Sequence, residues 1–311
     1  MARRRPPTVH GMALVDKPAA MTSHDVVAVL RKRFDERRIG HAGTLDPDAT
    51  GLLVAAVGSA TRLLRFAAGG AKRYECVVRF GTETDTLDAA GTVTARHGMA
   101  PTPDGVSGAA AAFLGETSQT PPMVSAVSVG GRRLHELARA GIEVEREPRT
   151  VEVTRFDLAP TDDPLVYRAV VECGPGTYVR VLAADLGHAL GGGAHIDGLR
   201  RTRSGEYDVR DARPPEAAEL RPVADLVAWM DTVELTGEEA ARVADGGRLD
   251  PARTPGDGPW ALSAPAGGLA AVHERADGVA RPAVVFPVPL GAPPAGAAQA
   301  PTPRPGEPGP G

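Results

Sequence analysis

The stretch GHAGTLDPDATG, residues 40–51, packs three glycines, two aspartates and a proline into twelve positions. The apolar run GLLVAAVG, residues 51–58, follows it and has the length and glycine punctuation of a buried strand. The glycines before Asp46 make unusual backbone angles accessible, and Pro47 fixes φ directly after it. The sequence therefore predicts a stiff turn that presents one carboxylate shortly before a strand.

Strand-like and helix-like patterns surround this turn in an irregular order. The predicted strands are residues 11–16, 51–58, 74–81, 150–158 and 166–174. The predicted helices are residues 23–34, 131–141 and 178–190, the first with Thr22 and Asp25 at capping-box spacing. This order lacks the even βα rhythm of a Rossmann domain or barrel. We therefore predict a mixed sheet with flanking helices.

Composition divides the chain into two domains and two terminal segments. The proline-rich segment DARPPEAAELRPV, residues 211–223, predicts a boundary after residue 222. A helix pattern at 236–247 and three short strand patterns then predict a small β-rich domain over 223–290. Residues 1–10 form a basic arm. Residues 291–311 are low in complexity, and we expect them to be disordered.

Positive charge is concentrated in the first part of the chain, although the net charge is −4. Over residues 1–80, fourteen Lys and Arg face seven Asp and Glu, and a second basic cluster follows at 198–210. Local basic patches are what phosphate contact requires, and distant acidic residues do not cancel them. Charge alone leaves nucleic-acid binding and an ordinary arginine-rich surface equally open.

Several classes of protein are disfavoured by what the sequence lacks. No apolar run is long enough for a membrane span or a signal peptide, so we expect a cytoplasmic protein with no membrane partner. Cys76 and Cys173 are far apart and predict buried thiols. The eight histidines have no metal-ligand spacing, and we expect neither a metal nor a cofactor. The segment GTETDTLDAAG, residues 81–91, resembles a metal loop but fits an Asx-rich turn better.

Five blocks of the chain, in this order and spacing, resemble the bacterial tRNA pseudouridine synthases that act on uridine 55 of the T-arm. The blocks begin GMALVDKPAAM, RRIGHAGTLDPDATG, KRYECVVRFG, QTPPMVSAV and GTYVRVLAADLG, and they start at residues 11, 37, 72, 119 and 176. The resemblance implies an α+β fold with a mixed, largely antiparallel sheet over residues 11–222. It also implies an isomerase that needs no cofactor.

The resemblance assigns the catalytic roles to three residues. Asp46 matches the family's aspartate, which must be ionised to act on the ribose or the base. Arg180 matches the family's arginine, and we expect this neighbouring cation to lower the pKa of Asp46. Tyr74 matches a tyrosine that can stack on a uracil turned out of the RNA and help to remove its C5 proton.

The remaining matches concern substrate binding. His41 resembles the residue that fills the space left by the extruded nucleotide, Tyr178 and Leu199 match pocket positions, and Lys17 matches a lysine that supports the loops. Residues 119–146 resemble an inserted element that grips RNA, with Arg132, Arg133 and His135 suited to phosphates. Ala20 stands where the family usually has glycine.

The partner implied by the resemblance is tRNA. The domain at 223–290 is predicted to be a reduced, PUA-like RNA-binding barrel, and we expect a monomer with no protein partner. Two alternatives stay open from the residues alone. An RNA chaperone of the tRNA elbow would not need Asp46, and a glycoside hydrolase using Asp46 and His41 would release uracil.

Overall fold

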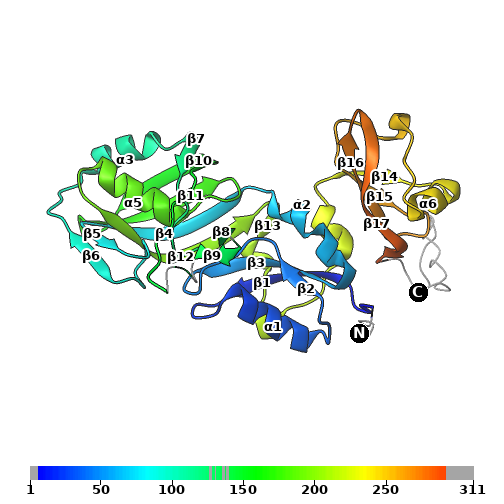
Figure 1. Cartoon of the computed structure of the whole chain (residues 1–311), viewed down its shortest axis with the longest axis horizontal. Helices are drawn as coiled ribbons and strands as arrows, with labels where there is room; N and C mark the ends of the chain where they lie inside the picture. The colour runs from blue at the N-terminus through cyan, green and yellow to red at the C-terminus, as the bar shows by residue number, and fades with distance from the viewer. Residues whose placement is uncertain (1–5, 126–127, 130, 135–136, 138–139, 292–311) are drawn as a thin grey trace, which may run out of the picture. The chain divides into compact units, whose positions relative to one another are not determined.

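The structure is a computed structural model that describes residues 6–125, 128–129, 131–134, 137 and 140–291 (Figure 1). The chain divides into two compact units, Met1–Trp229 and Met230–Gly311. Residues 223–229, which the sequence placed in the second domain, fall in the first unit, where Leu226 and Val227 are buried.

One mixed sheet organises the first unit. Among the described residues it has nine strands: β1 (Gly11–Lys17), β2 (Ile39–His41), β3 (Thr50–Val57), β4 (Lys72–Phe80), β7 (Gly115–Gln119), β10 (Arg149–Pro160), β11 (Val166–Cys173), β12 (Ala194–Ser204) and β13 (Tyr207–Asp208). Its main path runs β1-β3-β12-β4-β11-β10-β7. The pairings are antiparallel apart from β12 with β3. The predicted mixed, largely antiparallel sheet is confirmed.

Helices and two small hairpins complete this unit. They are α1 (Ser23–Arg33), α2 (Leu64–Ala68), α3 (Pro103–Ala111), α5 (Val179–Ala189), the hairpin of β5 (Thr82–Thr84) with β6 (Val93–Arg96), and the hairpin of β8 (Ser128–Val129) with β9 (Arg132–Arg133). Short 3-10 helices cover Gly58–Leu63, Val209–Asp211, Pro215–Ala217 and Val223–Val227. Helices α3 and α5 share one apolar core with β4, β10 and β11, while α1 packs against β1 and β3 in another (Figure 1).

Helix α1 forms where the sequence predicts it. The side chain of Thr22 accepts from the N–H of Asp25, and Asp25 accepts from the N–H of Thr22, which completes the predicted capping box. Val26, Val27 and Leu30 are buried on one face of the helix. The capping box and the apolar periodicity are local signals in the sequence, and here both agree with the way the helix packs, so the sequence was sufficient to predict it.

The helix predicted at 131–141 is wrong at its start. Arg132 and Arg133 are the strand β9, paired antiparallel with β8. Gly131 has φ +80°, and the Gly-Gly pair before β9 is a hairpin signal that outweighs the helical periodicity of its neighbours. Leu134 and Leu137 are helical, and the other residues between Leu134 and Ala140 lie outside the described part.

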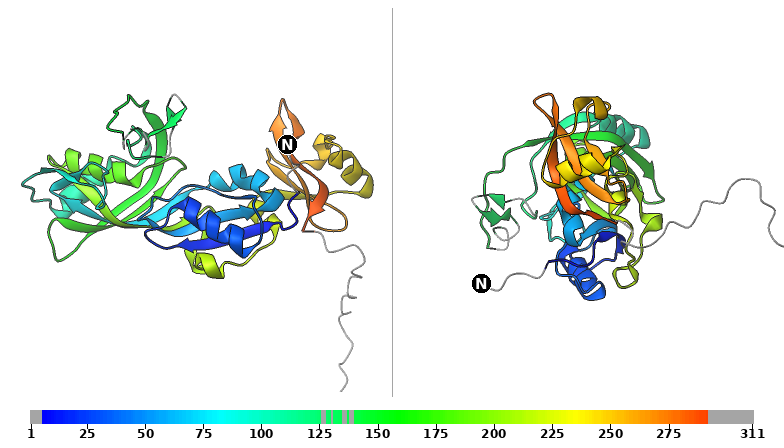
Figure 2. Two further views of the ribbon diagram at one scale, coloured as in Figure 1. Left: turned by 60° about the horizontal axis from the view of Figure 1, so that its bottom comes forward. Right: turned by 90° about the vertical axis from the view of Figure 1, so that its right-hand side faces the viewer.

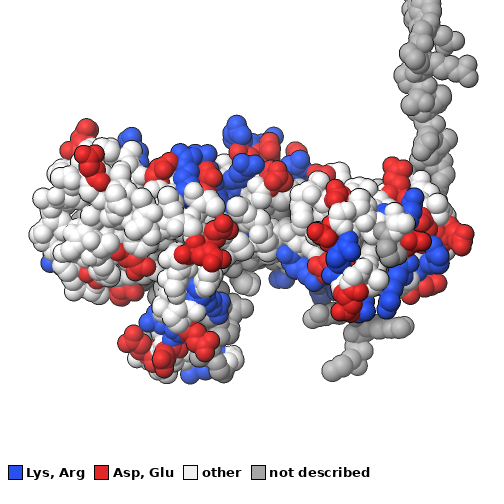
Figure 3. All heavy atoms as spheres, turned by 90° about the horizontal axis from the view of Figure 1, so that it is seen from above, with Lys and Arg blue, Asp and Glu red and all other residues white. Residues whose placement is uncertain are grey.

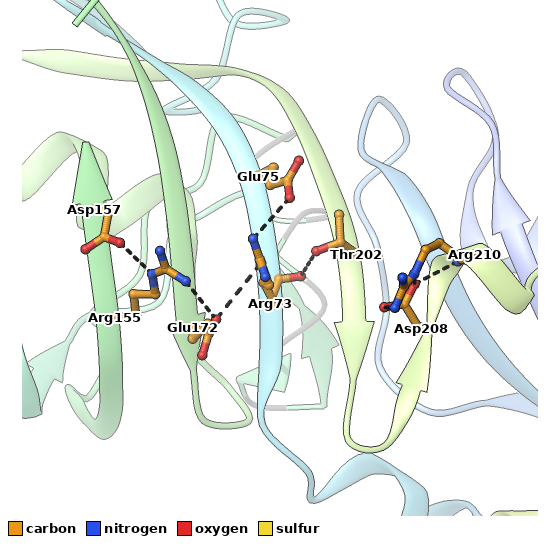
Figure 4. A network of polar contacts seen from close by, with 8 residues as sticks. All are labelled: Arg73, Glu75, Arg155, Asp157, Glu172, Thr202, Asp208 and Arg210. Carbon is orange, nitrogen blue, oxygen red and sulfur yellow. Dashed lines mark hydrogen bonds and ion pairs between the residues drawn. The ribbon is translucent and has the colours of Figure 1, made fainter. Parts of the chain in front are cut away.

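One face of the sheet carries a ladder of charged side chains (Figure 4). Arg155 pairs with Asp157 and Glu172, at 2.5 and 3.5 Å, and Glu172 also lies 4.0 Å from Arg73. These side chains are 38 to 60% exposed, so each pair contributes little to stability. On β4, exposed or half-exposed side chains such as Arg73 alternate with buried ones. The buried side chains point to the opposite face of the sheet, which packs on α3 and α5.

The second unit is a small β-rich fold with its own core. It contains β14 (Asp231–Glu234), α6 (Gly237–Ala244), a 3-10 turn (Pro251–Arg253), β15 (Trp260–Ser263), β16 (Leu269–Ala276) and β17 (Val279–Leu290). The sheet order is β14-β15-β16-β17, with β14 parallel to β15. Trp260, Leu262 and Val243 are fully buried at its centre.

No helix among the described residues is long and apolar enough to cross a membrane. Cys76 and Cys173 are free and buried, as predicted. Burial raises the pKa of Cys76 to about 12 and that of Cys173 to about 11, so neither is a reactive thiolate at neutral pH.

Candidate active site

The turn that carries Asp46 is fixed on both sides of the carboxylate. The N–H of Leu45 donates to Oγ of Ser23 over 2.9 Å, which ties the turn to the first residue of α1. On the other side, Nζ of Lys17 donates to the carbonyl of Pro47 over 2.9 Å. The position of Asp46 is therefore set by β1 and α1 as well as by its own loop.

Lys17 is fully buried, and its ammonium is satisfied by carbonyl oxygens. It donates to Pro18, Met21 and Pro47 at 2.9, 2.5 and 2.9 Å. Burial is the main cause of a lowered pKa for Lys17, against the charges of Asp48 and Asp46, which act to raise it. These contacts fit a lysine that supports the loops rather than one that contacts substrate.

The guanidinium of Arg180 is the centre of the site. It is 3% exposed and lies in the first turn of α5, with Nη2 3.0 Å from Oδ2 of Asp46 and Nη1 3.5 Å from Oδ2 of Asp88. It also donates to two carbonyls, to Thr86 over 2.7 Å and to Val124 over 2.9 Å. Arg180 therefore links α5 to the Asp46 turn, to the β5–β6 loop and to the insertion at 119–146.

The pKa of Asp46 is raised overall, with burial as the largest cause, although Arg180 acts to lower it as expected. Asp88, which the sequence analysis did not assign to the site, adds a second negative charge and raises the pKa further. The side chain of Asp46 is still 38% exposed in the free protein, so water continues to stabilise its ionised form.

A cavity of about 300 Å³ opens beside this pair. It is lined by Asp46, Pro47, Asp48, Ala49, Asp88, Ala89, Ala90, Arg180, Ile196, Asp197, Gly198 and Leu199. Three of the predicted site residues, Asp46, Arg180 and Leu199, thus meet at one cavity. Asp197 on its wall is paired with Arg79 at 3.0 Å.

Tyr74 does not line this cavity but lies in the buried core beside it. It is 8% exposed on β4, directly opposite Arg201 of β12. Arg201 is itself 1% exposed and donates to the carbonyls of Leu52 and Gly43 at 2.7 and 3.0 Å. Burial raises the pKa of Tyr74, and Arg201 opposes that rise.

His41 and Tyr178 lie at the ends of two elements, and neither is among the residues that line the cavity. His41 ends β2, and its ring stands edge-on to His24 with 6.0 Å between the centroids. Burial and the neighbouring His24 lower the pKa of His41. Tyr178 caps α5 and is held by Gln119, a residue that the sequence analysis did not single out.

The insertion is only partly described. Arg132 is exposed on β9, and Glu143 and Glu145, further along the insertion, are exposed as well. The side chain of Arg133 and the whole of His135 lie outside the described residues. Asp88 and Gln119 both belong to blocks that carry the family resemblance, and that membership was the available signal for them.

Comparisons with known proteins agree along most of the chain. Residues 31–179 match the family model of the TruB family pseudouridylate synthase N-terminal domain, and residues 180–236 match the tRNA pseudouridylate synthase B C-terminal domain. The tRNA pseudouridine synthase B of Arthrobacter sp. strain FB24 is 40% identical over 294 residues, covering 89% of this chain and 96% of the relative. The tRNA pseudouridine synthase B of Thermobifida fusca strain YX is 44% identical over 293 residues, covering 89% of this chain and 98% of the relative.

Solved structures show the same fold at lower identity. A crystal structure of a Cbf5-Nop10-Gar1 complex contains a chain with a TM-score of 0.66 and 24% identity, covering 87% of this chain and 83% of that one. A chain in a crystal structure of the archaeal box H/ACA sRNP Nop10-Cbf5 complex has a TM-score of 0.65 and 22% identity, and the match covers 92% of this chain and 89% of that one. The fold, the ordered blocks and the close relatives together place this chain in the TruB family of pseudouridylate synthases.

Proposed function

We propose that this protein converts uridine 55 in the T-loop of tRNA to pseudouridine. In this reaction the N1–C1′ bond breaks, C5 bonds to C1′, C5 loses a proton and N1 gains one, so the atoms balance without a cofactor. The observation that carries the proposal is the Asp46 carboxylate, 3.0 Å from the buried Arg180 guanidinium at the wall of a cavity, in a chain of this family.

Asp46 is proposed to act in its ionised form. Attack on C1′, addition at C6 and removal of a ribose proton all require a carboxylate rather than a carboxylic acid. When a nucleoside fills the cavity and excludes water, desolvation of Asp46 increases. Arg180 is the group that keeps the charge in place at that stage, because it is fixed by two carbonyl bonds before substrate arrives.

The target base must leave the stacked T-loop before it can reach Asp46. Turning a base out costs a few kcal/mol, which stacking and apolar contact offset. Tyr74 and Leu199 are proposed to contact the uracil, Tyr178 to line the pocket, and His41 to occupy the space that the nucleotide leaves. The Tyr74 hydroxyl is proposed to help remove the C5 proton. This step requires the phenolate, which burial disfavours and the Arg201 guanidinium favours.

The other parts of the chain are proposed to bind the rest of the tRNA. The insertion at 119–146, with Arg132 and Arg133, would contact the arm, and the β-rich second unit would act as the PUA-like domain. One of the similar solved structures is an H/ACA RNP bound to a substrate RNA containing 2′-deoxyuridine. We propose a monomer that acts on tRNA in the cytoplasm.

The test is tritium release from tRNA transcript labelled at uracil C5, with wild type and Asp46→Asn. Asp46→Asn removes the charge and keeps the shape, so we expect release to fall by at least about 10³-fold while tRNA binding persists. The matched control Asp162→Asn changes an exposed aspartate in the β10–β11 loop and should retain full activity.

Two outcomes would count against the proposal. No release by wild type would reject the activity, and equal release by Asp46→Asn would reject the role of the carboxylate. A transcript with cytidine in place of uridine 55 locates the reaction, because release should disappear with it. An RNA chaperone would bind tRNA equally well as wild type or Asp46→Asn and release nothing with either.

A further inference from the structure

The side-chain amide of Gln119 holds the backbone of Tyr178 by two hydrogen bonds. The N–H of Tyr178 donates to Oε1 of Gln119 over 3.0 Å, and Nε2 of Gln119 donates to the carbonyl of Tyr178 over 3.3 Å. Gln119 is 2% exposed, so water does not compete for either bond. Two bonds to one residue fix its rotation as well as its position.

The two partners stand at the starts of two functional segments. Tyr178 is the N-cap of α5, it has no side-chain cap of its own, and Arg180 follows two residues later in the first turn. Gln119 ends β7 and is the first residue of the insertion at 119–146. The amide of Gln119 thus supplies the restraint at a helix start that a capping side chain would otherwise give.

A second contact joins the same segments further along. Nη2 of Arg180 donates to the carbonyl of Val124, five residues into the insertion, over 2.9 Å. The same nitrogen lies 3.0 Å from the Asp46 carboxylate. The β8–β9 hairpin of the insertion stands off from the main sheet in both views of Figure 2. The base of this projecting element is therefore bonded to the guanidinium that faces Asp46.

We propose that Gln119 is a positioning residue for the isomerisation. It ties the base of the insertion to the start of α5, and in this way it holds Arg180 against Asp46. This inference rests on the proposed function for its catalytic consequence. Gln119 does not touch the cavity, so its effect reaches the reaction through Tyr178 and Arg180.

The chemistry of the amide makes the idea testable by one conservative change. The Tyr178 peptide requires one acceptor and one donor from the same side chain. A protonated glutamic acid offers both, whereas a glutamate offers acceptors only and repels the Tyr178 carbonyl. Gln119→Glu should therefore work at low pH and fail at high pH, while Gln119→Leu fails at both.

The experiment compares single-turnover tritium release and tRNA affinity for wild type, Gln119→Leu, Gln119→Glu and Thr154→Val. Gln119→Leu should release tritium roughly 10- to 100-fold more slowly, as expected for a displacement of about 1 Å at the site, with the tRNA Kd within about twofold of wild type. Gln119→Glu should match Gln119→Leu near about pH 8 and, relative to wild type, recover near about pH 5.5. Thr154→Val, which removes a side-chain bond to the Glu172 carbonyl in the same sheet, should behave as wild type.

Hydrogen exchange at the amides of Tyr178 to Arg180 gives a readout that needs no activity. Gln119→Leu should exchange faster there than wild type, with the rest of the sheet unchanged. Normal release by Gln119→Leu, a Gln119→Glu pH profile parallel to that of wild type, or unchanged exchange would overturn the inference. A wild type that releases no tritium rejects the proposed function instead, and exchange still decides whether Gln119 holds the helix start.

Discussion

Arg180 serves two carboxylates, and the second one changes how the first behaves. Asp46 lies 3.0 Å and Asp88 3.5 Å from its guanidinium, so the cation is shared. The sequence pointed to Asp46 because glycines and a proline surround it. Asp88 stands in an Asx-rich turn, where Thr86 donates to its carboxylate at 2.6 Å. This local hydrogen bond is enough to explain an aspartate in the turn, so nothing in the sequence indicated its ion pair with Arg180.

Asp88→Asn should shift the acid limb of the pH–rate profile to lower pH. The anion of Asp88 raises the pKa of Asp46, so neutralising it lets Asp46 ionise at lower pH. Asparagine keeps the oxygen that accepts from Thr86 and from the N–H of Ala90. The measurement is kcat/KM for tritium release between about pH 4 and 8.

Asp85→Asn is the matched control for this shift. Asp85 belongs to the same loop and accepts from the N–H of Thr92 at 2.8 Å, but it does not contact Arg180 through any described bond. Its acid limb should coincide with that of wild type. If the acid limb of the Asp88→Asn profile stays in place or moves to higher pH, Asp88 does not raise the pKa of Asp46 and this explanation is wrong.

Ala20 occupies a conformation that favours glycine. Its φ is +61°, in the loop between β1 and α1 whose carbonyls bind the Lys17 ammonium. A left-handed alanine costs about 1 kcal/mol relative to glycine, so Ala20→Gly should raise the free energy of unfolding by about that amount. Urea denaturation measures it.

The opposite sign is expected for the same substitution in a helix. Ala241→Gly, at an exposed position inside α6, should lower the free energy of unfolding of the second unit by about 0.5–1 kcal/mol. A destabilised Ala20→Gly would mean that the surrounding hydrogen bonds, rather than steric strain, determine the loop.

At the scale of elements, the sequence predicted those helices and strands that are determined by their own residues and close neighbours in the chain. The helix at 23–34 and the strand at 51–58 were recoverable because a capping box and an unbroken apolar run define them. Strand β12 was not, because GLRRTRS reads as a solvated basic segment. It is a strand because Arg201 finds its partners in β3, the Asp46 loop and Tyr74, which lie far away in sequence.

The candidate site divides in the same way. Asp46, Arg180 and Leu199 were predicted through the family resemblance, and they meet at the cavity. The direction of the pKa shift of Asp46 could not be predicted, because burial and Asp88 raise the pKa while Arg180 lowers it. Gln119 belongs to a block of the family resemblance, but its bonds to the Tyr178 backbone could not be predicted, because they depend on how distant segments pack.

His273 on β16 should make the second unit sensitive to acid. It is fully buried, neither ring nitrogen has a hydrogen-bond partner in the part of the chain that the structure describes, and burial lowers its pKa to about 4. As pH falls below the unfolded value of about 6.5, the unfolded chain takes up a proton before the folded one does, so stability falls until about pH 4. Between about pH 7 and 5 we expect a loss of roughly 2 kcal/mol.

His273→Leu should remove this part of the pH dependence. Leucine leaves no unpaired nitrogen in the apolar core, so the variant should be more stable than wild type at about pH 5. Fluorescence of Trp260, the cross-strand partner of His273, reports unfolding of this unit in a Trp229→Phe background. Equal pH dependence in both proteins would refute the assignment to His273.

At the scale of the whole molecule, charges of both signs meet on one face. On the face shown in Figure 3, Lys and Arg are interspersed with Asp and Glu. With a net charge of −4, RNA affinity must come from local phosphate contacts. The logarithm of the tRNA Kd should therefore rise linearly with the logarithm of salt concentration, by about 0.7 to 0.9 per contact.

Arg132→Ala should reduce that slope by about one contact. Arg155→Ala is the control, because the guanidinium of Arg155 is already paired with Asp157 and Glu172. It should leave the slope unchanged, as should Asp46→Asn. An affinity independent of salt would contradict RNA binding through phosphates.

The parallel pairing of β12 with β3 has a consequence for how the protein is made. Strand β12 lies between β3 and β4 in the sheet, yet about 140 residues separate it from β3 along the chain. While the ribosome is still synthesising the middle of the chain, the facing edges of β3 and β4 lack their partner and are open to self-association. The Asp46 loop and β3 can gain their hydrogen bonds from Arg201 only after that residue has emerged from the ribosome.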